Sequence, residues 1–239
     1  MKLSNVDLSS NVKVLVYGDS GSGKTCFAAS FPTPILLLDF DGKANSAASF
    51  YAGQEDRLAS IEVIKLTESF SKDPIIELTK AVKSLAEQQA KGTYEYKTLV
   101  IDSLTTFSSA VLKHIVKTNP GIKRVTSTQG EQPGMQDYGI LKREFAKLIP
   151  GLLSLDMNVV MLGHIRTEKD EVTGEVLRSV NMDGSFGADM PIYFEEVYHS
   201  YVREGKYFAQ TQADWKFKCR TQRRLPKEIP LTYDSLVIK

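Results

Sequence analysis

The stretch VYGDSGSGKT, residues 16–25, places three glycines, two serines, an aspartate and a lysine in a single turn. It directly follows the apolar residues Val14, Leu15 and Val16, and it leads into KTCFAASF, residues 24–31, which favours a helix. Glycine weakens a strand or a helix, so its concentration between the two calls for a local reason. A turn that must let another molecule approach its backbone closely has such a reason.

The turn matches the P-loop pattern G-x-x-x-x-G-K-[ST] through Gly18, Gly23, Lys24 and Thr25. Such a match arises by chance in a chain of this length on the order of 1% of the time. An ordinary flexible turn between strand and helix is the alternative. Backbone N–H groups can surround phosphate oxygens only where side chains are small, and a helix N-terminus adds positive potential.

The pattern therefore predicts that the chain binds ATP together with Mg²⁺. Lys24 is expected at the β- and γ-phosphates, and the Thr25 hydroxyl is expected on the metal. The residues expected to contact the nucleotide from this turn are Gly18, Asp19, Ser20, Gly21, Ser22, Gly23, Lys24, Thr25 and Cys26.

A second metal ligand is expected where another apolar strand ends. Asp102 closes the run LVID in residues 99–102. A carboxylate at the C-terminal end of a strand faces the ligand crevice of an α/β sheet. Taken alone, Asp102 would be read as a cap at the strand end. In a chain that also carries a P-loop, it is expected to hold Mg²⁺ with Thr25.

Composition indicates a folded globular protein. The 239 residues are 42% hydrophobic and 25% charged, and the formal net charge is +1. These values exclude a disordered chain and give no overall field toward nucleic acid or membrane. Cys26 and Cys219 lie far apart, so a zinc site is not indicated and two reduced thiols are expected. Residues 1–12 show no apolar signal segment, and no apolar run approaches the length of a membrane span. A cytoplasmic protein without a membrane partner is expected.

Strand and helix patterns alternate along the first two thirds of the chain. Asp73 and Pro74 are expected to open a helix that ends at Gly92, and a second helix over residues 138–152 is expected to bend near Pro150. The expected strands are residues 13–17, 35–39, 61–66, 98–102 and 158–163. Alternation of this kind predicts a mostly parallel sheet flanked by helices.

The last third is expected to add antiparallel strands. Residues 195–212 are expected to form a hairpin that turns at Glu204 and Gly205, and residues 215–222 one more strand. We see no linker, so a single domain over residues 1–239 is expected. It would include a short N-terminal segment, residues 1–11, and a C-terminal tail, residues 231–239.

The order of the motifs GDSGSGKT, LLLDFD, LVIDSLT and VVMLGHIR resembles the RecA/KaiC-like ATPase core. It is most similar to the minimal phage RecA-like ATPases associated with single-strand annealing, from about Val12 to about Pro230. The resemblance implies an ATPase stimulated by single-stranded DNA, acting in phage recombination or annealing in the host cytoplasm. It also implies a homo-oligomer, ring or filament, with a single-strand DNA-binding protein as a further partner.

The resemblance implies roles for six further residues. Asp41 takes the position of the family's catalytic glutamate but is one methylene shorter, so Asp39 remains a competitor. Both aspartates are alternatively the start of a turn at Gly42. His164 stands where the family senses the γ-phosphate, although a lone histidine is often structural. Arg220, Arg223 or Arg224 is implied to reach the nucleotide of an adjacent subunit, and a solvated sheet face is the alternative.

Two long loops are expected to hold DNA if the resemblance extends that far. They span residues 118–137 and 166–190, and the second is expected to turn at Thr173 and Gly174. By charge alone they read as solvated surface loops, because acidic residues accompany the basic ones. The basic residues expected to meet phosphates are Lys123, Arg124, Arg166, Lys169 and Arg178.

Two other functions are compatible with the P-loop. The first is a P-loop kinase, which requires a mobile lid with arginines over the phosphate donor. The second is a KaiC-like nucleotide switch that binds a protein partner in place of DNA.

Overall fold

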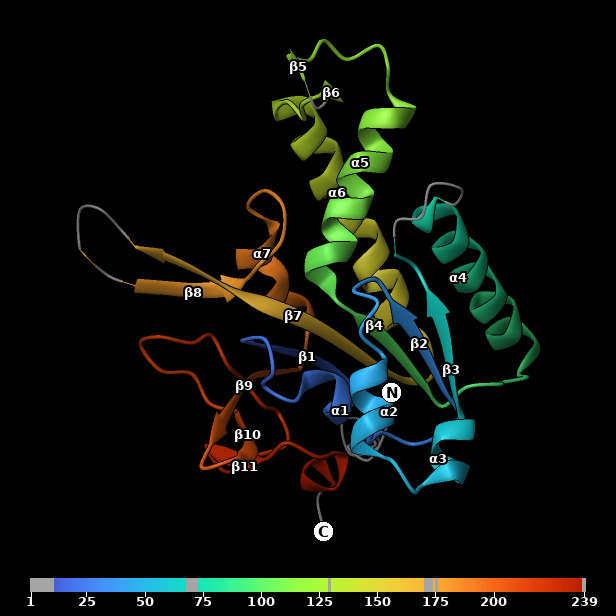
Figure 1. Cartoon of the computed structure of the whole chain (residues 1–239), viewed down its shortest axis with the longest axis vertical. Coiled ribbons are helices and arrows are strands. Elements are labelled where there is room, and N and C mark those ends of the chain that lie inside the picture. Colours follow the sequence, from blue (N-terminus) through green and yellow to red (C-terminus); the bar gives the residue numbers. More distant parts are fainter. Residues whose placement is uncertain (1–10, 68–72, 129, 170–173, 175, 238–239) are drawn as a thin grey trace, which may run out of the picture.

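The computed structural model describes residues 11–67, 73–128, 130–169, 174 and 176–237, and its centre is one large sheet (Figure 1). The strand order is β11-β10-β9-β1-β7-β4-β2-β3, with β8 paired to β7. The strands are β1 Lys13–Gly18, β2 Ile35–Asp39, β3 Ile61–Lys65, β4 Thr98–Asp102, β7 Asn158–Lys169, β8 Val176–Val180, β9 Glu196–Arg203, β10 Lys206–Gln210 and β11 Glu228–Pro230.

Helices flank this sheet. The α-helices are α1 Lys24–Ala28, α2 Asn45–Phe50, α3 Glu55–Ala59, α4 Pro74–Lys91, α5 Leu104–Thr118, α6 Met135–Leu153 and α7 Phe186–Asp189. Short 3₁₀ helices cover Met190–Tyr193 and Tyr233–Leu236. In the part of the chain that the structure describes, no helix has both the length and the apolar character needed to cross a bilayer.

The sheet is mostly parallel, as the sequence predicts. Strands β9, β1, β7, β4, β2 and β3 run parallel to their neighbours, whereas β8, β10 and β11 pair antiparallel. The carboxyl ends of β1, β2, β4 and β7 therefore meet at one edge of the sheet, where ligands of such folds bind.

The two faces of the sheet support separate cores. Leu15 and Met161 pack on one face with apolar side chains of α4, α5 and α6. Val16 and Leu162, one residue further along, pack on the other face with α1. Successive side chains of a strand point to opposite faces, so a strand covered on both sides must be apolar throughout.

The local signals of α4 are confirmed. The Asp73 carboxylate accepts the Ile75 N–H at 3.0 Å, Pro74 is the first helical residue, and Gly92 ends the helix in the left-handed conformation. Helix α6 begins before the expected first residue, Tyr138, and continues helically through Pro150 to Leu153. Tyr138 is an exposed residue of this helix and not part of the core.

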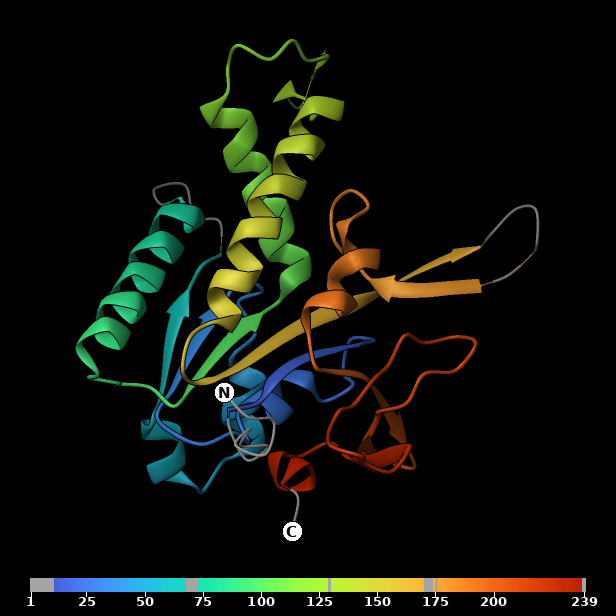
Figure 2. The same ribbon diagram turned by 180° about the vertical axis from the view of Figure 1, so that it is seen from behind.

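Helices α5 and α6 extend beyond the sheet as a paired projection (Figures 1 and 2). At its tip, β5 Thr126–Ser127 and β6 Gly130–Glu131 form a short antiparallel ladder within the segment expected as a loop. Arg124 donates to Asp137 at 2.9 and 2.7 Å and to Glu131 at 2.9 Å, and its side chain has no exposed surface. The expectation that Arg124 meets a phosphate is therefore wrong, because its guanidinium is committed inside the tip.

The C-terminal hairpin is confirmed, and the strand expected after it is wrong. Strands β9 and β10 turn at Glu204 and Gly205, both at positive φ. Residues 215–222 contribute only isolated bridges, Arg178 to Phe217 and Val197 to Arg220. The Asp214 carboxylate accepts the N–H groups of the two residues after Trp215 and bends the chain out of strand geometry.

Three expectations fall at the limits of the described residues. Strand β7 runs on to Lys169 and pairs antiparallel with β8, but Thr173 of the expected turn lies outside the described residues. Of the expected N-terminal segment only Asn11 is described. Within the expected C-terminal tail, Leu231 and Leu236 are buried in the core.

Candidate nucleotide-binding site

The turn after β1 borders a cleft of about 670 Å³ at the carboxyl edge of the sheet, hereafter the P-loop cleft. It is formed by the turn itself, the start of α1, the β2–α2 connection, α2, the end of β4, and one residue each from β7 and β10. Its lining residues are Ser20, Gly21, Ser22, Gly23, Lys24, Thr25, Cys26, Asp41, Gly42, Lys43, Asn45, Ser46, Ser49, Phe50, Asp102, His164 and Tyr207.

Two glycines of the turn are required by close neighbours from the C-terminal strands. A Cβ on Gly18 would lie 2.3 Å from the Ser200 hydroxyl oxygen. Gly23 has a φ of +84°, and a Cβ there would lie 2.6 Å from the Tyr207 ring. The turn is thus packed against β9 and β10, which fixes its backbone toward the cleft.

Lys24 is held at the centre of the turn. Its Nζ donates to the carbonyl oxygens of Gly18 at 3.0 Å and Asp19 at 2.8 Å. Burial lowers the pKa of Lys24, and the nearby carboxylate of Asp102 acts in the opposite direction. Gly18 and Asp19 therefore hold Lys24 in place through their carbonyl groups. Neither residue lines the cleft itself.

Thr25 and Asp102 meet as the sequence predicts. The Thr25 hydroxyl donates to the Asp102 carboxylate at 2.6 Å. Asp102 is only 4% exposed, and burial raises its pKa to about 6 against the opposing hydrogen bond from Thr25. A hydroxyl and a carboxylate oxygen side by side are ligands that Mg²⁺ accepts while it keeps water and phosphate oxygens. The pair fits that ion.

Asp41 faces the same cleft. Its carboxylate accepts hydrogen bonds from Ser103 at 2.9 Å and from Thr106, and it lies 3.2 Å from His164 Nε2. Burial opposes ionisation, but the hydrogen bonds from His164, Thr106 and Ser103 outweigh it and hold the pKa of Asp41 well below its usual range. A permanently charged carboxylate therefore stands beside the phosphate loop.

Asp39 has a different place. It is fully buried, and its two oxygens accept the backbone N–H groups of Gly42 at 2.8 Å, Lys43 at 3.2 Å and Ala44 at 3.1 Å. Those bonds close the β2–α2 connection. Of the two candidate carboxylates, only Asp41 lines the cleft.

His164 is brought to the cleft from β7. Its backbone N–H donates to the Thr105 hydroxyl oxygen at 3.0 Å, and its ring reaches Asp41. The histidine thus joins the cleft to the first turn of α5.

Arg220 and Arg223 do not lie in the cleft of their own chain. Arg220 is exposed and pairs through its backbone with Val197. The Arg223 guanidinium donates to the Leu236 carbonyl oxygen at 3.4 Å. The expected contact of Arg220 and Arg223 with the nucleotide of an adjacent subunit stays a prediction, because the structure describes a single subunit.

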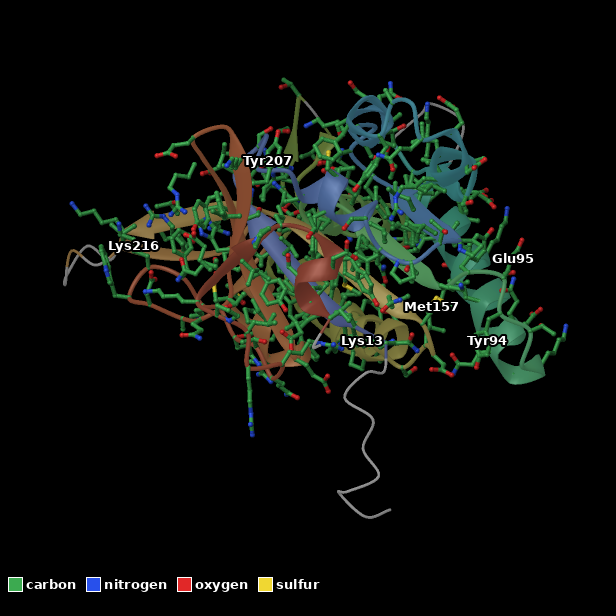
Figure 3. The ribbon with its side chains drawn as sticks, turned by 90° about the horizontal axis from the view of Figure 1, so that it is seen from below. Lys13, Tyr94, Glu95, Met157, Tyr207 and Lys216 are labelled. Carbon is green, nitrogen blue, oxygen red and sulfur yellow. The ribbon has the colours of Figure 1, made fainter. Side chains whose placement is uncertain are left out.

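Sequence reasoning missed two aromatic residues at the cleft. Phe50 is 55% exposed and Tyr207 (labelled in Figure 3) is 37% exposed, with ring centroids 6.4 Å apart. Exposed aromatic faces beside a phosphate loop are suited to a planar base. No local signal marks Tyr207, because it sits in an ordinary strand pattern and reaches Gly23 only through the fold.

Comparison with known proteins supplies the family. A family described as "AAA domain" matches residues 10–222. No curated protein matches the chain. Among solved structures, the chain is similar to a prototypical ATPase from the type III secretion system of pathogenic bacteria, with 13% identity and a TM-score of 0.49. That match covers 82% of this chain and 52% of the other, so the chain spans about half the length of that ATPase. With a P-loop cleft at the carboxyl edge of a mostly parallel sheet and a family match over most of its length, the chain belongs to the AAA-domain family of P-loop ATPases.

Proposed function

We propose that this protein is an ATP- and Mg²⁺-dependent ATPase that binds single-stranded DNA and acts as a homo-oligomer in phage recombination or single-strand annealing. The observation that carries the ATPase part is the convergence of Lys24, Thr25, Asp41 and Asp102 on one cleft. A single-strand DNA-binding protein is a further partner in this proposal.

Each of these side chains has a distinct task. Lys24 supplies charge to the β- and γ-phosphates, and Thr25 with Asp102 holds Mg²⁺, which neutralises phosphate charge when bound. Asp41 is too weakly basic to take a proton in the ground state, because its pKa is held low. Its role is therefore to orient the attacking water, as the carboxylate remains charged and fixed by Ser103 and Thr106.

The DNA part is supported by a second polar cleft of about 590 Å³ next to the first. His164 lines the P-loop cleft, and Arg166, two residues further along β7, lines the second cleft with the exposed ring of Tyr138. Asp183 in the second cleft accepts a hydrogen bond from Ser109 of α5 at 2.6 Å. Strand β7 thus lines both clefts, and α5 hydrogen-bonds a lining residue of each, Asp41 through Thr106 and Asp183 through Ser109, so a nucleotide in one cleft can bias the other.

The proposal of an oligomer is supported by the residue types that line the P-loop cleft. No arginine is among the described residues that line the P-loop cleft. ATPases of this kind commonly stabilise the transition state with an arginine supplied in cis or by a neighbour. An arginine that acts on a neighbour has to lie away from its own cleft, and Arg220 and Arg223 do so.

Fluorescence anisotropy on an oligo-dT strand at low salt tests the proposal. Binding is expected to tighten by about tenfold or more with a non-hydrolysable ATP analogue, in the usual range of coupling between two sites. The Lys24→Ala variant, as control, should bind DNA equally weakly with and without the analogue. Absence of DNA binding in a protein shown to bind ATP would rule out the DNA part.

A nucleotide switch that binds a protein is the second candidate. It is favoured by the acidic side chains Glu168 and Asp183 in the second cleft, which disfavour DNA phosphates. Stimulation of ATP hydrolysis by single-stranded DNA separates the two, because a protein-directed switch gains nothing from DNA. The kinase alternative is disfavoured because the described part of the chain places no arginine at the cleft, and a phosphotransfer assay tests it.

A further inference from the structure

Trp215, the single tryptophan of the chain, projects from the segment between β10 and β11 with 75% of its surface exposed. The turn around it is well defined. The Asp214 carboxylate accepts the N–H groups of Lys216 and Phe217 at 2.8 Å each, and the Asp214 N–H donates to the Phe217 carbonyl oxygen at 3.2 Å. Because its own turn holds the indole outward, Trp215 adds little buried apolar surface to the core of this subunit.

The residues after Trp215 fix the turn to the sheet. The Phe217 ring stacks on His199 with centroids 3.6 Å apart and planes 13° apart, and the Arg178 guanidinium lies 5.1 Å from that ring. Cys219 is buried beneath the turn. Phe217 and Cys219 thus point inward, whereas Trp215, Lys216 and Lys218 remain at the surface.

The surface of this turn is positive. Residues 216–227 contain six basic residues and no acidic one, in a chain whose net charge is only +1. In the part of the chain that the structure describes, neither Lys216 nor Lys218 forms a salt bridge. Lys216 Nζ lies 4.5 Å from the centroid of the Trp215 ring. An exposed indole, with Lys216 over one of its faces, and two ammonium groups without a carboxylate partner therefore occupy one small area.

We propose that this turn, residues 214–218 and hereafter the Trp215 loop, is a contact surface for single-stranded nucleic acid. Trp215 stacks on an unpaired base, and Lys216 and Lys218 contact the flanking phosphates. This combination binds single strands with little dependence on sequence, because every base has a π-face. The inference rests on the proposed function and assigns it a surface that neither expected DNA loop includes.

The position of the loop agrees with this assignment. The bridge between Arg178 and Phe217 places it against β8, and Figure 3 shows Lys216 at the side of the β7–β8 hairpin. A strand on the Trp215 loop can thus continue along that hairpin. A second copy of the chain is the competing occupant, and the lysines disfavour it because interface centres are depleted in lysine.

The unique tryptophan reports on the contact directly. Oligo-dT is added to the full-length protein with the ATP analogue, and tryptophan emission and anisotropy of a labelled strand are followed together. Emission is expected to fall in parallel with binding. Trp215→Ala is expected to weaken binding roughly tenfold, and Trp215→Tyr, which keeps a stacking ring, to restore most of it.

A charge-matched pair of variants tests the lysines. The Lys216→Ala/Lys218→Ala double variant is expected to reduce the slope of log affinity against log salt by about 1.4, since each phosphate contact on a single strand contributes about 0.7. Lys83→Ala/Lys91→Ala on α4 removes the same charge from exposed positions elsewhere and should leave the slope unchanged.

The outcomes separate the inference from the function on which it rests. DNA binding without a change in emission and unaffected by Trp215→Ala would overturn the inference and leave the proposed function standing. No DNA binding by the unaltered protein would remove both. Emission that changes with protein concentration, and not with DNA, would assign the loop to contact between copies and would also overturn the inference.

Discussion

Asp102 is subject to opposing demands from metal binding and from folding. It must be ionised to hold Mg²⁺, yet burial raises its pKa to about 6 from the ordinary value of 3.8. Between about pH 4 and pH 6 the folded protein therefore binds a proton that the unfolded chain does not, so without metal this group makes stability rise as pH falls. Above pH 6 the full cost remains, up to about 3 kcal/mol for the charged carboxylate.

The Asp102→Asn variant is thus expected to be more stable than the original protein at pH 7.5 without Mg²⁺, by about 1–3 kcal/mol. The difference should shrink as the pH is lowered from 6 toward 4. Mg²⁺-dependent hydrolysis should fall by about a hundredfold or more because the metal loses its charged ligand. Urea unfolding in EDTA, at pH 7.5 and at pH values from 6 down to 4, measures the difference in stability. Equal stability of the two proteins at pH 7.5 would contradict the prediction.

Substitution of the two neighbouring aspartates, Asp41 and Asp39, is expected to affect different properties of the protein. Asp41→Asn should keep ATP bound and slow its hydrolysis by about a hundredfold, because the cleft loses its fixed charge. Asp39→Asn should instead lower stability by about 1–3 kcal/mol, since buried backbone N–H groups lose a charged acceptor. ATP binding, hydrolysis and thermal unfolding of both variants measure this. The reverse ranking in hydrolysis would assign the catalytic role to Asp39.

At the scale of elements, the tip of the projection formed by α5 and α6 contains Arg124, which forms ion pairs with Asp137 and Glu131. The Arg124→Ala variant leaves the Asp137 carboxylate buried without its partner. Amides of β5 and β6 are expected to exchange with deuterium markedly faster, while hydrolysis without DNA stays unchanged. Lys123→Ala is the matched control, because Lys123 is exposed at the neighbouring position. Equal exchange in both variants would show that the ladder holds the tip without Arg124.

The elements also mark how far pattern reasoning reaches. Strands β1 and β4 could be predicted because their central residues, 14–17 and 99–101, are buried on both faces and therefore apolar without interruption. Residues 215–222 show the alternation of a strand, with Phe217 and Cys219 inward, yet they have no continuous partner. Alternation of apolar and polar residues indicates which side chains are buried. A strand also needs a hydrogen-bonded partner strand, and that partner comes from a segment distant in sequence.

At the scale of the whole molecule, a cleft that no arginine lines among the described residues predicts activity that depends on assembly. Hydrolysis per subunit is expected to rise with protein concentration, by about tenfold or more, as neighbours complete each cleft. Arg220→Ala should abolish that rise without changing ATP binding, and Lys227→Ala, an exposed control nearby, should not. Hydrolysis that is proportional to protein concentration over the whole range would argue for a self-sufficient subunit.

The sequence by itself determined the P-loop turn, the pairing of Thr25 with Asp102, and the mostly parallel sheet. These features can be predicted because motif spacing and the pattern of apolar residues are visible within short stretches of sequence. Only the tertiary structure placed Asp41 at the cleft and Asp39 inside the β2–α2 connection, paired Arg124 with Asp137, and placed Phe50 and Tyr207 at one cleft. Each of these arrangements depends on contacts between side chains that are distant in sequence. Such contacts leave no local pattern in the chain.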